Sequence, residues 1–232
     1  VGGAVRDLIS GMPIRDLDFT VEGNPSRIVR ELEKGGAKVT SRDESLRSFE
    51  LLLAGEVDAS ISAAREDFYA RPGAKPEVRF STIMEDLRRR DFSINAIAIS
   101  LNPNSRGLLL DPTNGLADLE RREIRALSIH SFTNQPVRLL RALRYAARMG
   151  FKMDSRTTEW FNLAMERKLH EMISPEDAGR ELRHPPGQVA ELVDVARLGV
   201  LGKLLQVDDA DLRRLGRLFK LCQQPVDRLQ LL

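Results

Sequence analysis

Gly2-Gly3-Ala4-Val5-Arg6-Asp7, followed nine residues later by Asp16-Leu17-Asp18, is the stretch of sequence that decides the fold. Two glycines that lead into a helix let backbone N–H groups approach a triphosphate closely at the positive helix N-terminus. Residues 16–21 alternate as a strand does, so Asp16 and Asp18 project to one face, where hard oxygen ligands can hold Mg²⁺. Each feature alone is more often a turn or a solvated strand face. Their succession indicates nucleotide chemistry on a sheet.

A third carboxylate, Asp58, strengthens this interpretation. Two expected strands, 49–54 and 56–62, form a hairpin that could bring Asp58 beside Asp16 and Asp18. Three acids on one sheet surface repel one another unless a cation neutralises them. Two Mg²⁺ ions about 3.5–4 Å apart would activate an attacking hydroxyl and stabilise a pyrophosphate leaving group, which is nucleotidyl transfer. Taken by itself, Asp58 is more simply an exposed strand residue.

The expected secondary structure and the balance of charge both change near residue 130. Residues 1–130 mix strands with helices and carry 19 basic against 21 acidic residues, whereas residues 131–232 carry 17 against 13. From residue 135 onward only helices are expected, over 136–149, 157–167, 175–182, 189–198 and 209–222. We therefore expect an α+β head, residues 1–130, followed by an all-α body, residues 131–232.

Composition excludes some classes of protein. No window of about 18 uncharged apolar residues exists, so we expect no membrane span. One cysteine, Cys222, and no apolar leader favour a reducing, cytoplasmic location. Of the 36 basic residues 29 are arginines, whose planar fork suits phosphate groups, although a GC-rich genome gives the same bias. The chain starts at Val1 without a methionine, so we expect further residues before it.

Residues 85–96 hold a second polar cluster inside an apolar segment. A helix expected over 84–96 places Asp91 and Asn95, four residues apart, on one face, with Arg90 beside them. Such a surface could contact phosphate, sugar and metal together. Polar side chains embedded among apolar ones cost free energy unless they have partners or a function. An isolated run of arginines is, in most proteins, a solvated patch.

Five motifs follow one another along the chain: Gly2-Gly3-Ala4-Val5-Arg6-Asp7, Asp16-Leu17-Asp18, Arg89-Arg90-Asp91-Phe92-Ser93-Ile94-Asn95-Ala96, Asp111-Pro112-Thr113-Asn114-Gly115-Leu116-Ala117-Asp118-Leu119 with Ile124-Arg125, and Pro136-Val137-Arg138-Leu139-Leu140-Arg141-Ala142-Leu143-Arg144-Tyr145-Ala146. In this order they resemble the class II tRNA nucleotidyltransferases, the CCA-adding type, and the bacterial poly(A) polymerases. The resemblance extends over roughly residues 1–205. It implies a head of the DNA polymerase β type with a mixed sheet, then a helical neck and a partial body that contact tRNA.

The resemblance also implies roles for individual residues. Asp16 and Asp18 match the acids that bind the catalytic metals, and Asp58 matches the third acid. The residues that match contacts to the triphosphate and ribose are Gly2, Gly3, Arg6, Arg90, Asp91 and Asn95. The implied cofactor is Mg²⁺, and the implied partners are ATP or CTP and the 3′ end of tRNA.

One motif departs from the family pattern. The family selects the incoming base with a Glu-Asp-x-x-Arg motif, whereas this chain has Asn134-Gln135-Pro136-Val137-Arg138. Gln135 can both donate and accept, so the rejection of guanine or uracil by an obligate acceptor is weakened or rearranged. Arg138 and Arg141 remain as candidates for nucleotide contacts, although they could instead cap helices or face solvent.

The leading hypothesis is a template-independent RNA nucleotidyltransferase that adds CMP, AMP or both to tRNA. The alternatives are a poly(A) polymerase, a narrowed or inactive RNA-binding relative, and a nucleotidyltransferase that modifies a protein or small molecule. Three scattered histidines and one cysteine do not form a zinc motif.

Overall fold

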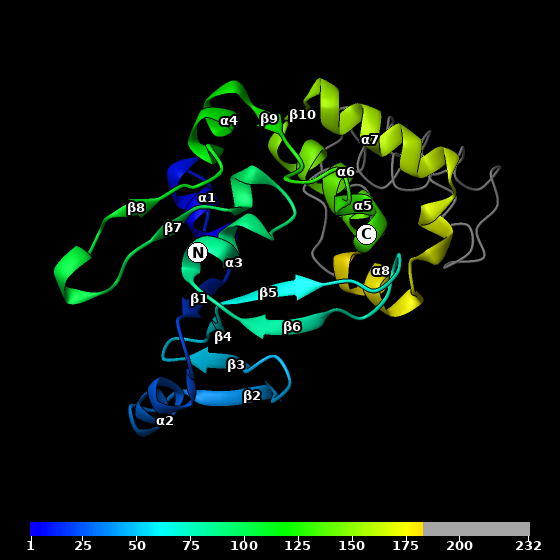
Figure 1. The fold of residues 1–232 in the computed structure, drawn as a ribbon. Helices are drawn as coiled ribbons and strands as arrows, with labels where there is room; N and C mark the ends of the chain where they lie inside the picture. Colours follow the sequence, from blue (N-terminus) through cyan, green and yellow to red (C-terminus); the bar gives the residue numbers. More distant parts are fainter. Residues whose placement is uncertain (183–232) are drawn as a thin grey trace, which may run out of the picture. The chain divides into compact units, whose positions relative to one another are not determined.

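The computed structural model describes residues 1–182, and its internal contacts divide the chain into two compact units between Asn134 and Gln135 (Figure 1). The helices expected over 189–198 and 209–222, together with Cys222, lie outside the described residues. In the described part of the chain, no helix combines the length and the apolar character that a membrane span requires.

The first unit is built on a four-stranded sheet. Its strands are β1 (Leu17–Val21), β2 (Lys38–Asp43), β3 (Ser48–Leu53) and β4 (Val57–Ala63), in the order β1-β4-β3-β2. β1 pairs with β4 in parallel, and the other two pairs are antiparallel, which confirms the mixed sheet. The strands expected over 16–21, 49–54 and 56–62 are therefore present with boundaries shifted by a residue or less.

One face of this sheet is apolar and packs against α2 (Ser26–Lys34). Val29 of α2 is buried among alternate residues of three strands, which are Leu17, Phe19, Val21, Phe49, Leu51, Ala59 and Ile61. Each fully buried Leu, Ile or Phe side chain contributes about 2 kcal/mol to folding. Because side chains alternate along a strand, the residues between these apolar ones belong to the opposite face, which α2 leaves open.

Shorter elements complete the first unit. They are α1 (Gly3–Ile9), the hairpin β5 (Arg65–Phe68) and β6 (Glu77–Phe80), α3 (Ile83–Arg88), a 3-10 turn η1 (Ser93–Asn95), β7 (Ala98–Ile99), a 3-10 turn η2 (Pro103–Ser105), β8 (Leu109–Leu110), α4 (Gly115–Arg121), β9 (Glu123–Ile124) and α5 (Ser131–Asn134).

The helix expected over 84–96 was wrong. α3 ends at Arg88, and the chain is extended at Phe92 before the turn Ser93–Asn95. Tertiary bonds cause the break. The Ser93 amide donates to the Arg125 carbonyl at 2.9 Å, and Phe92, which is fully buried, forms a bridge with Ala126. These partners replace the hydrogen bonds that a continuous helix would have made.

The second unit contains α6 (Arg138–Met149), α7 (Ser155–Glu166), a 3-10 turn η3 (Leu169–Met172) and α8 (Pro175–Leu182), which confirms three of the expected helices. The expectation of helices alone was wrong at β10 (Lys152–Met153). Gly150 has φ +65°, a left-handed conformation that ends α6, and Asp154 caps α7 by accepting from the Thr157 amide at 3.0 Å. The two strand residues lie between these helix ends.

Candidate active site

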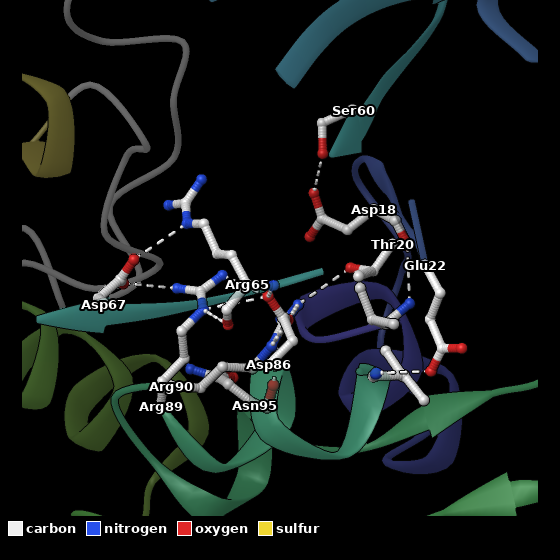
Figure 2. Close-up of polar contacts among 12 residues, drawn as sticks. Asp18, Thr20, Glu22, Ser60, Arg65, Asp67, Asp86, Arg89, Arg90 and Asn95 are labelled. Atoms are coloured by element: carbon white, nitrogen blue, oxygen red, sulfur yellow. Dashed lines mark hydrogen bonds and ion pairs between the residues drawn. The ribbon is translucent and has the colours of Figure 1, made fainter. Parts of the chain in front are cut away.

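The open face of the sheet carries the polar residues Asp18, Ser60 and Glu50 in neighbouring strands. Asp18 of β1 lies opposite Ser60 of β4, and Ser60 lies opposite Glu50 of β3. The Ser60 hydroxyl donates to Asp18 Oδ1 at 2.7 Å (Figure 2). One oxygen of the half-buried Asp18 carboxylate is thereby fixed by a protein donor.

Asp16 and Asp58 extend this polar face toward solvent. The parallel register pairs Leu17 with Ala59, so the preceding residues Asp16 and Asp58 stand side by side, both exposed. Burial raises the pKa of Glu50, and the negative charges of Asp18, Asp16 and Asp58 raise it further. All three predicted acids therefore act electrostatically on one point. Within residues 1–182, however, no three Asp, Glu, His or Cys side chains lie close enough together to hold a metal ion.

The sequence interpretation missed Glu50. Its side chain joins the carboxylate face because Ser48, Glu50 and Leu52 alternate along β3 with the buried Phe49 and Leu51. That alternation is visible in the sequence, but the pairing of β3 with β4 that places Glu50 opposite Ser60 is not.

The two glycines lie where the acids meet an arginine. Gly2 has φ +67°, and a β-carbon added to it would lie 2.7 Å from Arg90 Nη1 and 3.7 Å from Asp18 Oδ2. A β-carbon on Gly3 would lie 3.7 Å from Arg6 Nη2 and 4.0 Å from Asp18 Oδ2. A side chain at Gly2 would therefore be strained and would displace the arginine. The backbone, the carboxylate and the guanidinium converge on one small region.

Arg6, Asp91 and Asn95 form a buried hydrogen-bonded chain behind this region. Arg6 donates to Asp7 Oδ1 at 2.8 Å and to Asn95 Oδ1 at 2.6 Å, and Asn95 Nδ2 donates to Asp91 Oδ1 at 3.0 Å. Arg6 is 2% exposed, and Asp91 and Asn95 are each 6% exposed. The structure thus brings Asp91 and Asn95 together as expected, through a 3-10 turn rather than a helix face.

Asp86 organises the arginines, and sequence interpretation gave it no role. Its fully buried carboxylate accepts from Arg89 Nη2 at 2.6 Å through Oδ1 and from Arg90 Nη2 at 3.0 Å through Oδ2 (Figure 2). Oδ1 also accepts from the Arg65 amide at 3.2 Å. Burial by itself would raise the pKa of Asp86, but the two guanidinium charges and their hydrogen bonds outweigh burial and lower it. The available signal was an acid four residues before Arg90.

The candidates in the second unit have partners of their own. Arg138 Nε donates to Gln135 Oε1 at 2.9 Å, which orients the glutamine amide. Arg141 Nε donates to Glu181 Oε1 at 2.8 Å, and Arg144 Nη2 donates to Glu181 Oε2 at 2.9 Å. Burial opposes ionisation of Glu181, but the charges of Arg141 and Arg144 lower its pKa. Arg141 is therefore anchored from α8.

Comparison with known proteins gives a consistent picture. A family model described as "Poly A polymerase head domain" matches residues 1–125. The chain is 45% identical over 160 residues to an A-adding tRNA nucleotidyltransferase from Aquifex aeolicus, covering 68% of this chain and 19% of that protein. It is 40% identical over 149 residues to a CC-adding tRNA nucleotidyltransferase from Deinococcus radiodurans, covering 64% of this chain and 40% of that one. The chain thus spans less than half the length of these relatives.

Solved structures share the architecture. A CCA-adding enzyme in an apo form superposes with a TM-score of 0.79 at 32% identity, covering 95% of this chain and 53% of that one. A tRNA nucleotidyltransferase complexed with a primer tRNA and an incoming ATP analog gives a TM-score of 0.78 at 32% identity, covering 96% and 64%.

Proposed function

The chain belongs to the poly(A) polymerase head-domain family of class II tRNA nucleotidyltransferases, and we propose that it adds CMP, AMP or both to the 3′ end of tRNA without a template. The observation that carries the proposal is the convergence of Gly2, Asp18 and Arg90 on the open face of the sheet. A glycine backbone and a guanidinium suit a triphosphate, and the neighbouring carboxylates suit a divalent cation.

Asp16 and Asp18 would hold the cation, which we propose to be Mg²⁺. Their donor set fits, because it consists of hard carboxylate oxygens in a region whose negative charge adds to burial in raising the pKa of Glu50. When bound, the ion supplies charge stabilisation for the attacking hydroxyl and for the pyrophosphate leaving group. Ser60 keeps the Asp18 carboxylate oriented through its 2.7 Å hydrogen bond, and Asp58 adds negative charge beside Asp16.

The reaction joins the terminal ribose oxygen of the RNA to the α-phosphorus of the nucleotide, releases the hydroxyl proton and breaks the bond to pyrophosphate. Gly2, Gly3 and Arg90 bind the triphosphate where the acids and the guanidinium meet. Arg6, Asp91 and Asn95 are nearly buried and support the region where Gly2, Asp18 and Arg90 meet. Their small exposed surfaces contact the triphosphate and ribose.

We assign base selection to the expected neck and body, residues 131–232, and chemistry to the expected head, residues 1–130. Gln135 accepts from Arg138 through Oε1, as a carboxylate oxygen would, but its second polar group is a donor amide. Arg138 and Arg141 supply the cationic side of this region. We propose that the amide narrows the set of nucleotides, which favours addition of A alone or of CC alone over the complete CCA end. The setting of this reaction is the cytoplasm.

The test is nucleotide incorporation. The protein, Mg²⁺ and a tRNA lacking its 3′ CCA are incubated with labelled ATP and CTP, supplied separately and together. We expect incorporation of at least one nucleotide, its loss in D18N, and its retention in the matched exposed control D43N. A long run of adenylates would identify a poly(A) polymerase, and a complete CCA end would refute the narrowed specificity. If the folded protein incorporates nothing but still binds RNA, the non-catalytic alternative holds.

A further inference from the structure

A cavity of about 630 Å³ lies in the first unit beside the motif at residues 111–119, which the proposed function leaves unused. Its polar lining consists of Arg88, Thr113, Asn114, Asp118, Arg121 and Arg125. None of these residues belongs to the set assigned to the nucleotide. Arg88 pairs with Glu85 at 2.6 Å, whereas Arg89 and Arg90 pair with Asp86. The three consecutive arginines therefore divide between the cavity and the candidate active site.

The lining carries an excess of positive charge. It holds three arginines and one carboxylate, Asp118, which is 1% exposed. Asp118 accepts from Arg125 Nε at 2.8 Å and from Arg121 Nη1 at 3.4 Å, so a single negative charge serves two cations. The pair between Arg88 and Glu85 is solvent-exposed on both sides, and such pairs are weak and exchange readily with other anions. The cavity therefore favours an anionic ligand.

Part of this lining is preorganised. Asp118 also accepts from the Ser93 hydroxyl at 2.5 Å, which fixes it to the turn that carries Asn95. Arg125 is anchored at both ends, because Nη2 donates to the Thr113 carbonyl while Nε contacts Asp118. The Thr113 hydroxyl oxygen is buried and has no hydrogen-bond partner among the described residues. A buried hydroxyl without a partner is costly, and Thr113 is one of the residues that line the cavity.

We propose that this cavity binds phosphate groups of the RNA backbone, an inference that rests on the proposed function. Guanidinium forks match phosphate oxygens in a way that a point charge does not, and a threonine hydroxyl is a common additional donor to phosphate. The lining residues include no aromatic ring on which a base could stack, which favours the backbone over a nucleobase. Contacts of this kind position RNA without reading its sequence.

The test compares two charge-matched double variants of the full chain. R88A/R121A removes two cations from the cavity but leaves Arg125 and Asp118 in place. R30A/R42A removes two exposed cations from α2 and β2, which Figure 1 draws at the opposite end of the first unit from α4. The affinity for tRNA is measured by fluorescence anisotropy between about 50 and 200 mM KCl, and the affinity for ATP is measured alongside.

We expect R88A/R121A to weaken tRNA binding roughly tenfold and to flatten the dependence of log affinity on log salt by about one to two, with ATP affinity unchanged. R30A/R42A should stay within about twofold of wild type. Equal effects of the two double variants, an unchanged salt slope, or a loss confined to ATP would each overturn the proposal. If wild type incorporates nucleotide but the cavity variant binds tRNA normally, only this inference fails; if wild type neither binds tRNA nor incorporates nucleotide, the proposed function fails with it.

T113V separates binding from structure. Valine keeps the shape of threonine and removes the hydroxyl that lacks a partner, so the urea midpoint should not fall. The affinity for tRNA should fall about threefold, as expected for the loss of one hydrogen bond to phosphate. A lower urea midpoint with unchanged affinity would show that the hydroxyl has a structural role instead.

Discussion

Replacing Asp86 by asparagine removes one buried negative charge and leaves the shape of the side chain unchanged. In the native chain both carboxylate oxygens are used, Oδ1 by Arg89 and the Arg65 amide and Oδ2 by Arg90. The asparagine retains one acceptor oxygen, but its amide N–H groups face guanidinium donors. The two guanidinium groups then lose the carboxylate that they share.

The structure indicates which arginine is released. Arg89 keeps Asp67 at 2.9 Å and the Arg65 carbonyl at 2.8 Å. Arg90 keeps, among the described residues, two contacts of 3.4 Å, to Thr20 Oγ1 and to the Asn95 carbonyl. Losing one partner of a buried ion pair costs about 3–5 kcal/mol. Because both arginines are 19% exposed and Arg89 retains a carboxylate, we expect the lower end, about 3 kcal/mol.

Release of Arg90 also predicts a kinetic effect. A guanidinium displaced by about 1 Å from a triphosphate can lower kcat/KM by up to about 100-fold. We expect most of this loss to appear as a higher KM for the nucleotide. Urea unfolding and incorporation kinetics measure the two effects, with E85Q as the matched control because Glu85 forms an exposed pair and should change stability by less than about 1 kcal/mol. A D86N protein that unfolds earlier but has an unaltered nucleotide KM would show that Asp86 does not position Arg90.

Three further outcomes follow from the same contacts. G115A should destabilise the chain by about 3 kcal/mol or more, measured by urea unfolding, because its β-carbon would lie 2.2 Å from the Ser93 carbonyl oxygen and backbone must move. Q135D should broaden nucleotide use in the incorporation assay, because a carboxylate held by Arg138 has a second acceptor for the amino groups of cytosine and adenine. The folded pKa of Asp86 is lowered, so its contribution to stability is present above the unfolded pKa and is lost as pH falls through the folded pKa. The urea midpoints of wild type and D86N should therefore approach each other progressively as the pH falls below about 4.

The sequence predicted those parts of the fold whose pattern is local. β1, β3 and β4 alternate apolar and polar residues, and this periodicity survives because one face packs on α2. β2 escaped prediction because Lys38–Asp43 carries a single apolar residue, Val39, and its side chains are mostly exposed at the sheet edge. β5 and β6 were not predicted because each is only four residues long, with one apolar residue in β5 (Phe68) and two in β6 (Val78 and Phe80).

The candidate site shows the same division between local and long-range information. The motif spacing placed Gly2, Asp18 and Arg90 in one hypothesis, but their approach depends on contacts between segments about 70 residues apart. The helix expected over 84–96 failed because Ser93 bonds to Arg125, which periodicity cannot register. Glu50 was missed for a related reason: its place depends on the register of β3 against β4.

Opposite pKa shifts on the two sides of Gly2 together describe the ligand that this site fits. On the sheet side, burial raises the pKa of Glu50 and three neighbouring carboxylates raise it further, so four acidic side chains share that surface. On the α3 side, two guanidinium groups lower the pKa of Asp86 despite its burial, and three arginines there pair with two aspartates, so positive charge prevails. A ligand that satisfies both must present anionic oxygens to Arg90 and a cation to Asp18. A nucleoside triphosphate bound to a divalent metal ion has this polarity, whereas a free phosphate or a metal ion alone would satisfy one side only.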